Sequence, residues 1–113
     1  MLPLLKQNRD LVYIVGKEEC DFGISDVVLY KRGEQLVLHR IISKENFYYE
    51  ILGDNQYISE KVSENQIIGV MTAFLRNGKE VLIDDPKYQK YVKKIMNMSM
   101  FRRKIYSKIR RVI

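Results

Sequence analysis

The sequence predicts a mainly β domain, a coiled antiparallel sheet or partly open β-barrel, followed by a C-terminal basic amphipathic helical segment. Up to residue 83, almost every segment is either a turn or a short apolar run rich in β-branched and aromatic residues. Polar turns separate these runs at hairpin-like intervals. After residue 85 the apolar residues change to helical spacing and the acidic residues stop.

The first apolar run, residues 11–15, has the composition of a strand that is buried on both sides or lies at the centre of a sheet. A second strand is predicted at 27–30. Gly33 can adopt a positive φ, so the turn around it reverses the chain into a third strand at 36–42. Another polar turn leads to a fourth strand at 47–52, and these three strands are expected to form an antiparallel meander.

A long strand follows at 66–76, with a bulge or bend expected at Gly69. Asn77-Gly78 is the strongest hairpin signal in the chain, and it turns the chain into a last strand at 79–83. No internal repeat or low-complexity linker interrupts this series of strands.

A helix is predicted to start at Asp85 and Pro86, because aspartate caps the first turn and proline is tolerated there. We therefore divide the chain into a β domain at 1–85 and a basic amphipathic helical tail at 86–113. The tail holds ten of the 20 Lys and Arg and none of the 14 Asp and Glu, which leaves residues 1–85 with a net charge of −4. The basicity thus belongs to the tail.

The composition fits one globular domain of 113 residues, 46% hydrophobic and 30% charged. No run reaches the roughly 18–20 apolar residues of a transmembrane helix, and the N-terminus lacks a secretory signal pattern. The single cysteine, Cys20, cannot form an internal disulfide and favours a reducing compartment. We expect a cytoplasmic protein, with a peripheral position at the membrane as an option, and neither a cofactor nor a metal.

His39, the only histidine, and Asp54 are the residues best suited to carry chemistry. His39 shares one face of its predicted strand with Val37 and Ile41, so it is expected to be partly buried. A histidine and a carboxylate on neighbouring strands can form an acid/base pair. The alternative is a packed core histidine beside an aspartate whose Gly-Asp-Asn context is favourable turn chemistry.

Five short motifs follow one another along residues 1 to about 75: Met1-x-Pro3, a strand opened by Asp26-Val-Val, LHRI with His39, Gly53-Asp54-Asn55, and Ile-Ile-Gly-Val. Their order resembles the catalytic domain of type I signal peptidases, with histidine where bacterial members usually have lysine. The resemblance implies the β-fold that this family shares with LexA-like repressors. It also implies a small bacterial member of the histidine-containing branch.

The resemblance implies that His39 is the general base of a Ser-His-Asp site, and that Asp54 orients the imidazole and stabilises its charged form. Met1 and Pro3 would shape the strand that presents the nucleophile. The nucleophilic serine is expected directly before Met1, so the chain as numbered lacks it. The remaining residues implied for the motifs or for substrate binding are Asp26, Gly53 and Asn55.

None of the serines in the chain matches the nucleophile motif. Ser25 occupies the position of a motif glycine, where a structural role in a turn is expected. Cys20 is predicted to be a bystander, because nothing in its turn-like surroundings indicates a lowered thiol pKa.

We expect a serine endopeptidase domain that processes a peptide or protein precursor, inactive as numbered because the nucleophile is absent. The alternative is a non-catalytic module on the same fold that binds a peptide, a partner or a membrane. The tail is expected to pack on the sheet, to contact an anionic membrane surface or to mediate homodimerisation. Nucleic acid is not expected, since no base-reading motif accompanies the basic residues. The residues predicted for membrane or partner contact are Lys93, Lys94, Arg102, Arg103, Lys104, Arg110 and Arg111.

Overall fold

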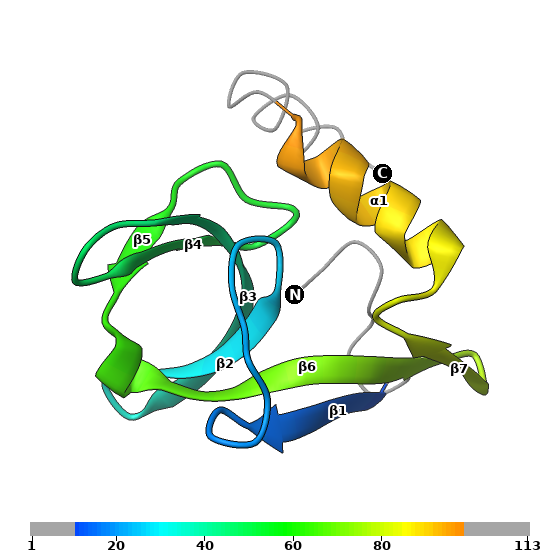
Figure 1. Cartoon of the computed structure of the whole chain (residues 1–113), viewed down its shortest axis with the longest axis horizontal. Helices are drawn as coiled ribbons and strands as arrows, with labels where there is room; N and C mark the ends of the chain where they lie inside the picture. Colours follow the sequence, from blue (N-terminus) through cyan, green and yellow to red (C-terminus); the bar gives the residue numbers. More distant parts are fainter. Residues whose placement is uncertain (1–10, 99–113) are drawn as a thin grey trace.

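The structure is a computed structural model that describes residues 11–98. It contains an open antiparallel sheet of seven strands and one short helix, so the predicted mainly β fold is confirmed (Figure 1). The elements are β1 (Leu11–Gly16), β2 (Val27–Arg32), β3 (Gln35–Lys44), β4 (Tyr49–Leu52), β5 (Glu60–Val62), the 3-10 turn η1 (Glu64–Gln66), β6 (Ile67–Arg76), β7 (Lys79–Leu82) and α1 (Pro86–Met96).

The strand order is β1-β6-β2-β3-β4-β5, with β7 also paired to β6. The predicted meander of β2, β3 and β4 is confirmed, because these consecutive strands pair antiparallel in sequence order. The short strand β5 and the turn η1 were not predicted. The fourth strand begins at Tyr49 and not at Phe47, whose side chain is exposed.

The two faces of the sheet carry different apolar clusters. Val27 and Val28 are neighbours on β2, and their side chains belong to different clusters, as alternation along a strand requires. Val28 packs in the cluster inside the curl of β2 to β5, together with Ile41. Val27 packs in the cluster that α1 covers with Tyr88 and Val92. Figure 1 shows the curl of the sheet and α1 beside it.

Helix α1 begins where the sequence predicts. Oδ1 of Asp85 accepts hydrogen bonds from the backbone N–H groups of Lys87 at 2.9 Å and Tyr88 at 3.1 Å, and proline occupies the first turn. Tyr88, Val92 and Ile95 form the buried stripe of the helix. The helix therefore packs on the sheet, which was one of the interpretations of the tail.

Several predicted residues lie outside the described part of the chain. They are Met1, Pro3, Arg102, Arg103, Lys104, Arg110 and Arg111. Within residues 11–98, no helix is long and apolar enough to cross a membrane.

Strand β1 is not a central strand, so the prediction of its burial was wrong. Among the described residues it pairs with β6 alone, and it stands at one end of the strand order. Leu11, Tyr13 and Ile14 are exposed, whereas Val12 and Val15 are half-buried. The β-branched and aromatic content of this run records its preference for an extended backbone and carries no information on the position of the strand in the sheet.

The predicted bulge at Gly69 is confirmed. The register between β2 and β6 shifts between the pairs Leu29–Gly69 and Tyr30–Ile67. A Cβ atom on Gly69 would lie 2.5 Å from Cγ2 of Ile14 and 2.8 Å from the carbonyl oxygen of Val15. Strand β1 therefore approaches β6 so closely at this point that only glycine fits.

Replacing Gly69 by alanine is expected to destabilise the protein by about 1–3 kcal/mol, because β1 must move away to admit the methyl group. Urea unfolding measures the change. The matched control is Gly16→Ala: Gly16 faces Gly69 across the strand pair, and an added Cβ there meets no atom within 4 Å. We expect that control to change the free energy of unfolding by less than about 0.5 kcal/mol. Equal losses in the two variants would contradict the close approach.

Both predicted hairpin turns contain residues with positive φ. Gly33 has a φ of 60°, Asn77 of 53° and Gly78 of 78°. Two consecutive positive φ values are what a two-residue hairpin turn with Asn-Gly requires, and they set the register of β7 on β6.

Candidate functional site

His39 lies in the middle of β3, on the face that points into the curl of the sheet. It is opposite Val28 on β2, and only 8% of its surface is exposed. Burial lowers the pKa of His39, and the positive charge of Arg32 acts in the same direction, whereas Glu60 and Asp54 partly offset the change. The imidazole is therefore neutral at neutral pH, which is the state of a proton acceptor.

The Nδ1 side of the His39 ring faces a polar cluster on β2 and β5. The distance from Nδ1 to the hydroxyl oxygen of Tyr30 is 3.4 Å, the long end of a hydrogen bond. The Tyr30 hydroxyl donates to Oε1 of Glu60. Arg32 in turn donates to Glu60, from Nε to Oε2 at 3.2 Å and from Nη2 to Oε1 at 2.5 Å. The hydrogen bonds from Arg32 lower the pKa of Glu60, so this carboxyl is ionised.

The Nε2 side of the ring faces Gly53, directly after β4. A Cβ atom on Gly53 would lie 3.0 Å from Nε2 of His39 and 2.9 Å from Oε1 of Gln56. The same Oε1 accepts a hydrogen bond from the backbone N–H of Gly53 at 3.3 Å. The structure thus places Gly53, the predicted motif glycine, next to His39, the predicted base. A side chain at position 53 would crowd the Nε2 atom of His39.

The Asp54 carboxylate faces Arg40 and the helix. Nε of Arg40 donates to Oδ1, and Nη2 donates to Oδ2, both at 2.8 Å, and both side chains are fully buried. Tyr91 of α1 also donates its hydroxyl to Oδ2, at 2.7 Å. Asp54 is close enough to His39 to raise the pKa of that residue. The predicted role of Asp54 in orienting the imidazole stays a prediction.

All five N–H donors of Arg40 have acceptors, which is how a guanidinium tolerates complete burial. Besides the two bonds to Asp54, Nη1 donates to the carbonyl oxygen of Ser25 at 2.7 Å, and Nη1 and Nη2 each approach the Tyr88 hydroxyl at 3.4 Å. These partners belong to the turn before β2, the loop after β4, and α1. Arg40 therefore fixes the helix and two loops to the middle of the sheet.

The predicted turn role of Ser25 is confirmed. Ser25 has a φ of 83°, a conformation that glycine adopts more easily, and its carbonyl oxygen faces Arg40. Asp26 stabilises the same turn, since its Oδ2 accepts from the backbone N–H of Gly23 at 2.8 Å. Asn55 is half-buried directly after Asp54.

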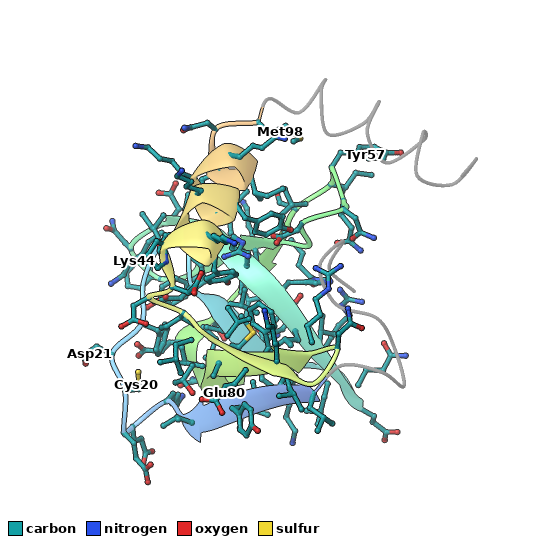
Figure 2. All side chains as sticks on the ribbon, turned by 90° about the vertical axis from the view of Figure 1, so that its right-hand side faces the viewer. Cys20, Asp21, Lys44, Tyr57, Glu80 and Met98 are labelled. Atoms are coloured by element: carbon teal, nitrogen blue, oxygen red, sulfur yellow. The ribbon has the colours of Figure 1, made fainter. Side chains whose placement is uncertain are left out.

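Cys20 lies on the loop between β1 and β2, where Figure 2 shows it next to Asp21 and well below α1. Its thiol donates to the carbonyl oxygen of Asp21 at 3.3 Å, and it forms no disulfide. Lys93 and Lys94 are exposed in the last turn of α1. Among residues 11–98, no three His, Cys, Asp or Glu side chains gather into a potential metal site.

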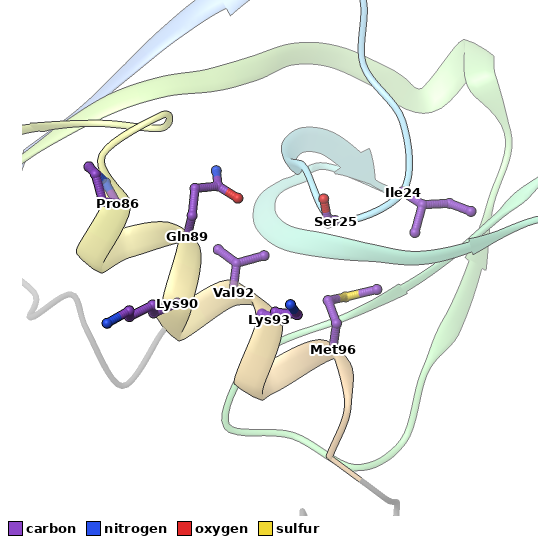
Figure 3. A pocket seen from close by; sticks show the side chains of 8 residues that line it. All are labelled: Ile24, Ser25, Pro86, Gln89, Lys90, Val92, Lys93 and Met96. Carbon is purple, nitrogen blue, oxygen red and sulfur yellow. The ribbon is translucent and has the colours of Figure 1, made fainter.

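An open groove of about 510 Å³ separates α1 from the turn before β2. Figure 3 shows Val92 and Met96 of the helix directed toward Ile24 and Ser25 of the turn. The groove lies on the face of the sheet that Arg40 points to. His39 points to the opposite face and is not among the residues that line it.

Sequence reasoning missed Arg40, Tyr30, Arg32 and Glu60. One signal for Arg40 was available, because a charged residue between Leu38 and Ile42 on an apolar strand face needs a buried partner, and Asp54 follows the adjacent strand. No comparable signal marks Glu60, which belongs to a three-residue strand in a polar segment.

Comparisons with known proteins assign no relationship to this chain: no family model, no curated protein and no solved structure matches it.

Proposed function

We propose that this protein is a signal-peptidase-like serine endopeptidase domain of the fold shared with LexA, in which His39 is the general base. The observation that carries the proposal is the state of His39: a buried imidazole with a lowered pKa, beside the Gly-Asp pair of the resembling motif. The motif order from Asp26 to residues 67–70 adds support, because the motifs lie at the start of β2, on β3, directly after β4 and on β6 of one antiparallel sheet.

In the proposed reaction, Nε2 of His39 accepts the proton of a serine hydroxyl as the oxygen attacks a peptide carbonyl. The same nitrogen then returns the proton to the leaving amine. Gly53 places no side chain of its own against Nε2 of His39, where a Cβ atom would lie 3.0 Å from that nitrogen. The negative charge of Asp54 stabilises the imidazolium that forms, while its carboxylate oxygens accept hydrogen bonds from Arg40.

The proposed nucleophile is a serine directly before Met1, by resemblance to the Ser-Met-x-Pro motif. A protein with serine at that place is expected to react covalently with a fluorophosphonate probe. The matched control carries alanine at the same place and keeps every other residue. Mass spectrometry of the intact protein measures the labelled fraction. Labelling of the serine form that does not exceed labelling of the alanine form would contradict the proposal.

The second candidate function is a non-catalytic module that binds a peptide, a partner or an anionic membrane surface. The observation in its favour is the position of Lys93 and Lys94, which are exposed on α1 while Tyr88, Val92 and Ile95 face the sheet. Each basic side chain near an anionic surface adds about 1 kcal/mol of attraction. The probe experiment separates the two candidates, because a binding module has no reason to activate a serine.

A further inference from the structure

We infer that Tyr30 and Glu60 are positioning residues for His39, and that they hold its imidazole with the proton on Nδ1 and the free electron pair on Nε2. This inference deepens the proposed function, since a base that acts through Nε2 needs this tautomer. It assigns to a tyrosine and a glutamate on β2 and β5 the orienting role that the resemblance gives to Asp54.

The single proton of the Tyr30 hydroxyl decides the direction of its hydrogen bonds. A phenol carries one O–H proton, and the Tyr30 hydroxyl donates it to Oε1 of Glu60. Toward His39, at 3.4 Å, the hydroxyl oxygen is left with electron pairs only. The contact is a hydrogen bond only if Nδ1 of His39 carries the proton and donates it, so Nε2 is unprotonated in the neutral ring.

The charge of the Glu60 carboxylate makes it the acceptor of the Tyr30 proton. Glu60 is ionised, because hydrogen bonds from Arg32 and Tyr30 stabilise its negative charge. Burial and the adjacent carboxylate raise the pKa of Tyr30, so the phenol keeps its proton and remains a donor. The direction of the two hydrogen bonds, from His39 to Tyr30 to Glu60, is thereby fixed.

The charged form of His39 depends on the groups that surround the ring. Four groups on the neighbouring elements act on the ring: Arg32 and Tyr30 on β2, Glu60 on β5, and Asp54 after β4. Arg32 disfavours the imidazolium, whereas Glu60 and Asp54 favour it. Asp54 accepts hydrogen bonds from Arg40 and Tyr91, whereas Glu60 is linked to the Nδ1 edge through the Tyr30 hydroxyl.

The experiment is a nitrogen-15 NMR titration of the full chain, in which His39 is the only histidine, so both ring signals belong to this residue. Two-bond couplings to the ring protons distinguish Nε2, which couples to Hδ2 and Hε1, from Nδ1, which couples to Hε1 alone. Above its pKa, the ring of the unmodified protein is expected to show a protonated Nδ1 and an unprotonated Nε2. Tyr30→Phe removes the acceptor, and we expect the Nδ1–H preference to be lost. A ring that carries its proton on Nε2 in the unmodified protein would overturn the inference.

Glu60→Gln removes the negative charge that favours the imidazolium and that pairs with Arg32. Because the positive charge of Arg32 is then no longer compensated, the pKa of His39 is expected to fall further below its ordinary value. The matched control is Glu80→Gln, the same change on the exposed strand β7 (Figure 2), which is expected to leave the titration unaltered. An unchanged tautomer in Tyr30→Phe, or an unchanged pKa in Glu60→Gln, would remove that residue from the role. Tyr30→Phe deletes one oxygen, and the Glu60 side chain is one-third exposed, so both variants are expected to fold.

These measurements do not depend on a nucleophile. If the probe fails to label a protein with serine before Met1 while the NMR results hold, the positioning of His39 stands and the peptidase proposal falls. If labelling occurs and His39 carries its proton on Nε2, the inference falls together with the assignment of Nε2 as the accepting atom, while the proposal of a serine endopeptidase stands.

Discussion

Replacing Arg40 by methionine is expected to destabilise the protein by about 3–5 kcal/mol, because the Asp54 carboxylate then stays buried without its opposite charge. Both side chains of this pair are fully buried, so no solvent is available to take over from the guanidinium. The loss also removes the donors to Ser25 and Tyr88, so the turn before β2 and α1 lose a common attachment. A cost of this size is a large fraction of the stability of a small domain.

Urea unfolding measures this loss, and the pair Arg32–Glu60 supplies the control. Its side chains are 49% and 33% exposed, so Arg32→Met is expected to cost about 1 kcal/mol or less. The double variant Arg40→Met with Asp54→Leu removes both buried charges and is expected to recover much of the stability lost in Arg40→Met. A double variant no more stable than Arg40→Met would show that the network contributes through its hydrogen bonds and not through charge compensation.

The hairpins β2–β3 and β6–β7 could be predicted from local chemistry, and the position of β1 could not. Turns at Gly33 and Asn77 depend on residues adjacent in sequence, so their pattern is visible in the chain itself. The position of β1 depends on which edge of β6 remains unpaired after β2 and β7 have formed their hydrogen bonds with it. An apolar run of five residues looks the same at the centre and at the edge of a sheet.

The candidate site likewise contains residues that local sequence patterns predict and residues that only the pairing of distant strands brings together. Alternation along β3 places His39 and Arg40 on opposite faces. The structure gives them separate partners: Tyr30 inside the curl for His39, and Asp54 with α1 outside it for Arg40. The sequence predicted Asp54, in the Gly-Asp-Asn motif, as the carboxylate that partners His39. Glu60 reaches the site because the short strand β5 pairs with β4, a contact without any local signal.

His39 and Arg40, adjacent residues on β3, therefore make separate sets of contacts. The Arg40 network holds the loop that contains Gly53 and Asp54, and that loop borders the Nε2 edge of His39. The ion pair between Arg40 and Asp54 on one face of β3 thus fixes the loop that contacts His39 on the other face.

In a protein with serine before Met1, His39→Gln is expected to reduce the rate of fluorophosphonate labelling by about 10²–10⁴-fold, because the serine hydroxyl loses its proton acceptor. Glutamine is close to histidine in size and polarity, so the loss reports on proton transfer more than on packing. The rate is measured by intact-mass spectrometry at several probe concentrations. Labelling at the original rate in His39→Gln would exclude His39 as the base.

The same histidine is expected to contribute to the pH dependence of both the proposed activity and the stability. The pKa of His39 is lowered by burial, so the acid limb of the labelling rate is expected to lie below the ordinary histidine pKa of about 6.5. The unfolded chain binds the proton more readily than the folded protein, so stability is expected to fall as the pH drops from about 6.5 through the folded pKa. His39→Gln removes this part of the acid destabilisation. Because the chain has one histidine, the midpoint of the rate profile must coincide with the pKa that NMR gives for its ring, and two different midpoints would mean that another group is the base.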